Sequence, residues 1–159
     1  MSLQFQVRSA FETSPFGKFC ASTRPSEKTV KRSPTRSATP AANIRSGEKI
    51  TVRVKLRFRE PVENAVAGIL IRTRIGVSVY GTNTELEQTP IGPRRRDELV
   101  EVDFEFPCNL CPQEYTLTAA SHDPDGTAHE WLEEALRFTV VDDRPTAGVA
   151  NLNAEVRFR

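Results

Sequence analysis

The side chains best suited to chemistry gather around the single tryptophan of the sequence. Trp131 closely follows His122, Asp123 and His129, a more polar neighbourhood than a core tryptophan usually has. Proteins hold sugars by placing an aromatic ring against an apolar C–H face and hydrogen-bonding groups around the hydroxyls. Trp131, His122 and His129 are therefore candidate sugar contacts. The alternative is a tryptophan packed between two sheets, with two ordinary loop histidines.

A second candidate group is the run Tyr80-Gly81-Thr82-Asn83-Thr84, which joins an aromatic ring to hydroxyl and amide groups. Arg72 and Arg74 precede it and would suit an acidic sugar or a phosphate cap, because guanidinium groups pair well with such anions. An ordinary turn at residues 82–84 is the alternative. We predict a shallow groove whose contact residues are Arg72, Arg74, Tyr80, Thr82, Asn83, His122, His129 and Trp131.

Motifs for catalysis are missing from the sequence. It contains no glycine-rich phosphate loop, no GxSxG elbow and no HExxH. Glu133 and Glu134 are adjacent, so they do not converge on one substrate atom as a glycosidase pair must. Acidic residues from separate strands could form such a pair, which leaves a glycan-active enzyme as a rival that a reducing-sugar assay would expose. We expect a non-catalytic binding protein without a cofactor.

The three cysteines do not indicate a disulfide framework or a metal site. Cys108-Asn109-Leu110-Cys111 is a CxxC, but a zinc finger needs a second pair, and Cys20, His122 and His129 lie at spacings that match no standard finger. A redox CxxC usually opens a helix after a strand, whereas Pro107 and Pro112 bracket this one. We interpret it as a loop sequence and expect no metal.

Charge is distributed unevenly along the chain. Residues 1–59 hold 13 Lys and Arg against 3 Asp and Glu, whereas the remainder holds 9 against 18, so a net charge of +1 hides a basic first part. Residues 24–45 are rich in Ser, Thr, Pro and Arg and predict a long loop or disordered linker. The basic part lacks the aromatic residues that stack nucleic-acid bases, so we expect no nucleic acid. Binding to an anionic surface, with a steep salt dependence, is the rival interpretation.

Period-two alternation of apolar and polar residues predicts short strands and turns rather than helices. In Lys49–Arg59 the apolar residues alternate with a basic face, and in Val100–Phe106 with an acidic face, so neighbouring strands would form ion pairs. A turn is expected at Asp123–Gly126, one helical turn at Trp131–Leu136 and a polar loop at residues 81–98. The remaining predicted strands are 3–7, 66–75, 77–80, 115–119, 136–140 and a last one in the tail from Gly148 to Phe158.

This pattern predicts an all-β, immunoglobulin-like antiparallel β-sandwich. Residues 1–45 would supply a first strand and the basic linker, and residues 46–159 the sandwich. No apolar run is long enough to span a bilayer and the first residues lack a signal-peptide core, so the sequence is typical of a cytosolic protein.

Several motifs in a fixed order carry a resemblance to a known family. They include Ser46-Gly47-Glu48, Pro61-Val62-Glu63-Asn64, Tyr80-Gly81-Thr82-Asn83-Thr84 and His122-Asp123-Pro124-Asp125-Gly126. With Trp131-Leu132 and Leu136–Val140, they make roughly residues 44–152 similar to the C-terminal domain of Wzt-type ATPases, the ATP-hydrolysing subunits of ABC transporters that export lipopolysaccharide O-antigen. Residues 8–45 are longer and more basic than that family's pattern, and the nucleotide-binding domain is missing.

The resemblance implies a sandwich that binds the exported polysaccharide at the cytoplasmic face of the bacterial inner membrane. Its expected partners are the O-antigen glycan, the transporter permease and the ATPase domain. It also implies a homodimer formed by exchange of a C-terminal strand, which would give the tail 148–158 a role as an added edge strand. The family's sugar contacts vary with the glycan and are not carried over. The rival function is a protein-interaction sandwich that docks a transporter or ATPase partner without binding sugar.

Overall fold

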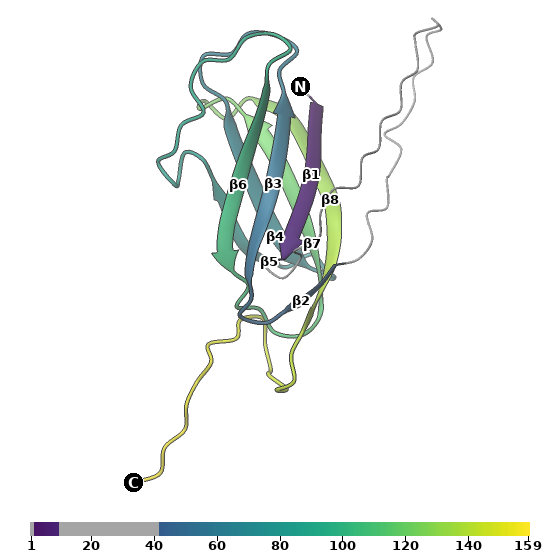
Figure 1. Ribbon diagram of the computed structural model, residues 1–159, viewed down its shortest axis with the longest axis vertical. Helices are drawn as coiled ribbons and strands as arrows, with labels where there is room; N and C mark the ends of the chain where they lie inside the picture. Colours follow the sequence, from purple (N-terminus) through teal and green to yellow (C-terminus); the bar gives the residue numbers. More distant parts are fainter. Residues whose placement is uncertain (1, 10–41) are drawn as a thin grey trace, which may run out of the picture.

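The computed structural model describes residues 2–9 and 42–159 and consists of two β-sheets packed face to face (Figure 1). One sheet has the strand order β1-β3-β6 and the other the order β2-β8-β7-β4-β5. Nothing helical in these two ranges has the length and apolar character needed to cross a membrane. The strands are β1 (Ser2–Ser9), β2 (Ala42–Arg45), β3 (Lys49–Arg57), β4 (Val66–Thr73), β5 (Ser78–Asn83), β6 (Leu99–Pro107), β7 (Glu114–His122) and β8 (Ala128–Val141).

The predicted all-β sandwich is confirmed, with one correction to its sheet pairing. Every pair of neighbouring strands is antiparallel except β2 and β8, which run parallel. The core lies between the sheets and is built from the inward-facing residues that the alternation predicts. Val54 and Leu56 of β3 and Tyr115 of β7 are completely buried. The Tyr115 hydroxyl, which is buried with them, donates to the Cys111 carbonyl oxygen at 2.8 Å.

The outer face of the β3–β6 pair carries the predicted ion pairs, which form a cross-strand charge ladder. Arg53 lies opposite Asp103 and donates two hydrogen bonds to it at 2.6 and 2.7 Å. The Lys55 ammonium lies 2.7 Å from the Glu101 carboxylate, and the Lys49 ammonium 2.7 Å from Glu105. The basic outer face of β3 is thus neutralised by the acidic outer face of β6.

Four predictions about local structure were wrong. Residues 42–45, assigned to the linker, form β2, and residues 81–83, assigned to a loop, complete β5. The predicted helical turn at Trp131–Leu136 is part of β8, because ladder hydrogen bonds override the helical preference of Glu-Glu-Ala-Leu. Within this chain the tail forms no strand: after the bridge between Leu110 and Ala150 and the buried Asn151, residues 152–159 extend away from the sandwich (Figure 1). The linker residues 10–41 lie outside the described ranges.

A buried polar cluster fixes the point where this tail leaves the sandwich. Asn151 is 4% exposed, and its amide donates to the Ser46 hydroxyl at 3.0 Å and to the Asp142 carboxylate at 3.1 Å. Its side-chain oxygen accepts from the Arg144 guanidinium at 3.2 Å. These bonds tie the start of the tail to the turn before β3 and to the end of β8.

The CxxC lies in the connection between β6 and β7 and faces the protein interior. Cys108 and Cys111 are both buried and are not joined to each other. Burial raises the pKa of the Cys108 thiol to about 11, so the reactive thiolate is scarce at neutral pH. The CxxC lies outside the strands, as its interpretation as a loop sequence predicts. Among residues 2–9 and 42–159, no group of three His, Cys, Asp or Glu side chains could hold a metal ion.

Candidate functional site

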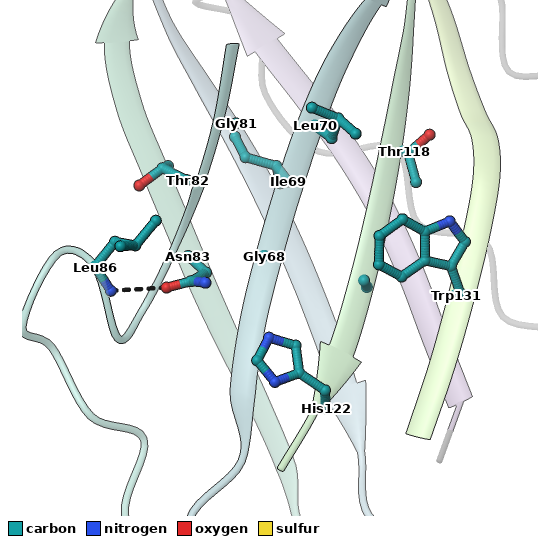
Figure 2. Close-up of a pocket in the computed structure, with 11 residues that line it drawn as sticks. Gly68, Ile69, Leu70, Gly81, Thr82, Asn83, Leu86, Thr118, His122 and Trp131 are labelled. Carbon is teal, nitrogen blue, oxygen red and sulfur yellow. Dashed lines mark hydrogen bonds between the residues drawn. The ribbon is translucent and has the colours of Figure 1, made fainter. Parts of the chain in front are cut away.

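A groove with a volume of about 230 Å³ lies on the outer face of the five-stranded sheet (Figure 2). It crosses strands β5, β4, β7 and β8 near the end of the sandwich at which β5 and β7 finish. The residues that line it are Gly68, Ile69, Leu70, Gly81, Thr82, Asn83, Leu86, Thr118, Ala120, His122 and Trp131.

Two glycines leave space for side chains of the neighbouring strand on the β4–β5 side of the groove. A Cβ atom on Gly68 would lie 3.1 Å from the Asn83 Cβ, and one on Gly81 would lie 3.0 Å from the Leu70 Cδ1. Both distances are tighter than ordinary van der Waals contacts. Glycine at these positions therefore lets Asn83 and Leu70 lie directly over the backbone of the neighbouring strand, which is one of the uses of glycine within a sheet.

Trp131 provides the apolar wall of the groove on β8. It pairs with Ala120 of β7, whose small side chain leaves space beside the indole. The tryptophan is 53% exposed, so it does not plug the space between the sheets. Leu86, which is 68% exposed, lies in the loop after β5 and lines the groove at the other side. The groove thus runs between two large apolar side chains that solvent can reach.

An irregularity in β8 lies opposite Thr118 at the floor of the groove. Leu117 pairs with Leu136 and Ala119 with Leu132, so three residues of β8 stand against Thr118 alone. Glu134 in this bulge has a φ of 46°, the left-handed conformation that a bulge often requires. Thr118 is 1% exposed, and its hydroxyl oxygen has no hydrogen-bond partner among the described residues. Such a buried unpaired hydroxyl is unusual in a folded protein.

Asn83 and His122 each use one polar side-chain atom in a hydrogen bond within the protein, which leaves the other polar atom available. The Asn83 side-chain oxygen accepts from the Leu86 amide at 2.7 Å, which directs its NH₂ group to the groove side (Figure 2). The His122 Nδ1 lies 2.7 Å from the Asp123 carbonyl oxygen. Because a carbonyl can only accept, Nδ1 carries the proton and the Nε2 of the neutral ring remains an acceptor.

The other five predicted contact residues are not used in this way. Tyr80 pairs with the core residue Ile71 and its ring lies 5.5 Å from that of Phe106, so it faces the opposite side of the sheet. Thr82 borders the groove, but its hydroxyl donates to Glu87. His129 lies on the same side as the buried Ser121, with its Nε2 2.9 Å from the Asp123 carboxylate.

The two predicted arginines lie outside the groove lining. Arg72 is on the same outer face, two residues beyond Leu70, and its guanidinium lies 3.9 Å from the Glu133 carboxylate. Arg74 follows the end of β4, and its guanidinium lies 3.8 Å from Glu114. Of the eight predicted contacts, the structure therefore brings together Asn83, His122 and Trp131, with Thr82 at the border.

Sequence reasoning missed the groove residues that carry no obvious chemistry. Gly68, Leu70 and Ala120 are ordinary strand residues, and Thr118 is one of several threonines in β7. The available signal was the alternation itself, which places Leu70 and Thr118 on outward-facing positions. Only the register of β4, β5, β7 and β8 shows that these positions are neighbours.

Comparison with known proteins gives one family and a matching fold. A family model described as the Wzt C-terminal domain matches residues 35–152, more than half of the chain. The structure is similar to the crystal structure of the C-terminal domain of Wzt, with a TM-score of 0.67 and 21% identity over 76% of this chain and 75% of that chain. No curated protein matches the sequence. The chain therefore belongs to the Wzt C-terminal domain family, which suggests a role in the O-antigen ABC transporter system.

Proposed function

We propose that the chain recognises a polysaccharide of the O-antigen type without transforming it, and so couples glycan capture to export by an ABC transporter. The observation that carries the proposal is the half-exposed indole of Trp131, at the wall of a groove that also holds unpaired hydrogen-bonding groups. Family membership supplies the class of ligand.

The groove offers both kinds of contact that a sugar needs. The indole presents an apolar face to the C–H groups of a pyranose ring, while the Asn83 NH₂ group donates and the His122 Nε2 accepts hydrogen bonds from its hydroxyls. The Thr118 hydroxyl can do either once a ligand displaces the side chains above it. With so few anchors, we expect a dissociation constant on the order of micromolar to millimolar.

Titration with the O-polysaccharide of the protein's own organism tests this proposal. Because the chain has one tryptophan, its fluorescence reports on the groove alone. We expect a saturable change in the indole emission together with a calorimetric binding signal. The absence of both signals at millimolar glycan would contradict the proposal. Release of reducing ends during the titration would favour a glycan-active enzyme instead.

The variant Asn83→Asp sharpens this test. It keeps the oxygen that accepts from the Leu86 amide, so the loop stays in place, but it replaces the donating NH₂ group with an oxygen. We expect weaker glycan binding with an unchanged melting temperature. Ile75→Ala is the matched control, because Ile75 is 81% exposed at the β4–β5 turn and does not line the groove. Equal losses in both variants would argue against a role for Asn83.

In this proposal the chain acts at the cytoplasmic face of the bacterial inner membrane, together with the transporter permease and the ATPase domain. The family supports this placement. Coexpression with a tagged permease and ATPase from the same gene cluster tests it: the chain should copurify with them. If added soluble glycan abolishes the copurification, the glycan alone links the components.

The exposed tail favours a second function, which is association with another copy of the chain. Leu152, Val156 and Phe158 are 86%, 81% and 96% exposed, although such large apolar side chains are normally covered. We propose that the tail adds as a strand to a sheet edge of a second copy, giving a homodimer by strand exchange. Light scattering should give a dimer for the full chain and a monomer after truncation at Asn151. A monomeric full chain would contradict the proposal.

A further inference from the structure

The groove is free of formal charge apart from its one titratable residue, His122. None of its eleven lining residues is Lys, Arg, Asp or Glu. The cations on the same sheet face lie near carboxylates: the Arg72 guanidinium is 3.9 Å from Glu133, and the Arg137 guanidinium is 2.7 Å from Glu134. An acidic sugar that entered the groove would lose water around its carboxylate and gain no opposite charge, which makes binding of a charged group unfavourable.

The residues that flank the lining in sequence are acidic. Glu85 precedes Leu86, Glu130 precedes Trp131, and Asp123 follows His122. Of these, Glu130 lies on the opposite strand face from Trp131, and Asp123 is paired with the His129 Nε2 at 2.9 Å, so the flanking residues add no cation to the groove. The groove therefore differs from the arginine-edged site that the sequence indicates, and the difference determines which sugars it can accept.

The balance of apolar and polar contacts further restricts the class of sugar that the groove can bind. Leu70, Leu86, Ala120 and Trp131 provide apolar surface, while only Asn83, Thr118 and His122 provide hydrogen-bonding groups that are not already bonded within the described residues. A hexose brings a hydroxyl on almost every carbon, and each one that enters without a partner weakens binding. A sugar with one hydroxyl replaced by a methyl group fits this balance better.

The size of the groove limits the ligand to a short unit. Its volume of about 230 Å³ lies below the roughly 300–1,000 Å³ typical of pockets for drug-sized ligands. The contacts described above therefore act on one sugar unit, while neighbouring units of a polysaccharide extend along the open sheet surface.

From this combination we infer that the groove selects an uncharged, deoxygenated sugar unit, such as a 6-deoxyhexose, over the corresponding uronic acid and over the parent hexose. The inference rests on the proposed function, and it specifies the ligand class for the same site. The methyl group of the 6-deoxy sugar would contact the apolar walls, where a carboxylate or a hydroxymethyl group would find no partner.

Matched methyl glycosides that differ only at C6 test the inference. Each of the galacto, gluco and manno configurations is used in three forms, with a methyl, a hydroxymethyl or a carboxylate group, and each compound competes with the polysaccharide for the Trp131 fluorescence signal. Within the configuration that competes, we expect the 6-deoxy form to bind best and the carboxylate form to be at least about tenfold weaker. A carboxylate form that competes equally well or better overturns the inference.

The outcomes distinguish failure of this inference from failure of the proposed function. If the polysaccharide binds and none of the nine compounds competes, the inference is overturned and glycan recognition stands. If the polysaccharide itself does not bind, the proposed function fails and the inference fails with it.

A charge introduced at the groove provides a second measurement. Leu86→Lys places an ammonium group at the rim, and its backbone amide can still donate to Asn83. We expect it to strengthen competition by the carboxylate form about fivefold and to weaken competition by the 6-deoxy form, whose methyl group loses an apolar contact. Ile75→Lys is the matched control and should change neither. An unchanged carboxylate affinity in Leu86→Lys would show that charge does not control selection.

Discussion

The two outer faces of the sandwich show opposite ways of using polar groups. On the β3–β6 face, Arg53, Lys55 and Lys49 are each paired with a carboxylate of the neighbouring strand within 2.6 to 2.7 Å. On the face of the five-stranded sheet, the Thr118 hydroxyl is buried without a partner and Trp131 is half exposed. One face satisfies its own polar groups, whereas the other leaves groups that a ligand can satisfy.

This difference shows that the density of charge does not identify a binding face. The charge ladder is the more conspicuous surface in the sequence, but its neutralised groups offer little to an external ligand. The groove is built from a few small, polar and aromatic residues whose hydrogen-bonding capacity is incompletely used. Variants that affect one face and spare the other therefore provide the most direct test of the comparison.

The largest expected effect on binding comes from Trp131→Ala. Removal of a central aromatic contact of this kind costs about 2 kcal/mol, or roughly 30-fold in affinity. Because the side chain is half exposed, the melting temperature should change little. Isothermal titration calorimetry measures the first quantity and thermal unfolding the second. Full binding by Trp131→Ala would remove the basis for treating this face as the ligand face.

Thr118→Val should have the next largest effect, and it separates binding from stability. Valine has nearly the same shape but lacks the hydroxyl, so a hydrogen bond to the ligand is lost and affinity should fall about three- to tenfold. Replacement of a buried unpaired hydroxyl by a methyl group should leave the melting temperature unchanged or raise it. A lower melting temperature would indicate that the hydroxyl has a structural partner, and unchanged affinity would exclude it as a ligand contact.

A smaller effect, confined to stability, is expected for Arg53→Ala. This variant removes the pairs with Glu101 and Asp103, which are partly exposed and therefore weakly stabilising. The melting temperature should fall by no more than about 2 °C, and glycan affinity should not change. A reduced affinity would mean that the two faces are coupled through the core.

The smallest effect concerns the acid side of the stability profile. The hydrogen bond from Lys55 lowers the pKa of Glu101 from its ordinary value of 4.5, and the bond from the Arg95 amide does the same for Glu98. The folded state then binds fewer protons than the unfolded chain, so stability is complete above about pH 4.5 and decreases as the pH falls below it.

Glu101→Gln should make that decrease shallower, since one of the two carboxylates no longer titrates. Melting temperatures recorded across the acidic range, at low and at high salt, measure the effect. High salt should reduce it because the pairs are exposed to solvent. An identical acid profile in the variant would exclude Glu101 as a contributor.

The elements that were predicted well are those whose signal is local. Alternation along β3 and β6 defined both strands and the ion pairs between them, because each pair requires only that the two strands be neighbours. Trp131–Leu136 was misjudged because the bulge inserts extra residues and breaks the alternation that reveals a strand. The tail alternates as well, but alternation cannot show whether a strand finds a partner within its own chain.

The candidate site was predictable by residue type but not by position. Asn83, His122 and Trp131 stand out by their chemistry, and the structure places them around one groove. Tyr80 and His129 carry equally suitable groups, but a shift of one residue along a strand places a side chain on the other face. The contribution of Thr118 depends on the bulge opposite it, which is a tertiary feature.

The buried amide of Asn151 has a consequence for how the chain is used. It fastens the start of the tail where β8 finishes, whereas Asn83 and His122 lie at the far tips of β5 and β7 (Figure 1). Anything bound by the tail is therefore attached at the opposite end of the sandwich from the groove. The molecule can therefore be tethered through its tail while the groove stays open.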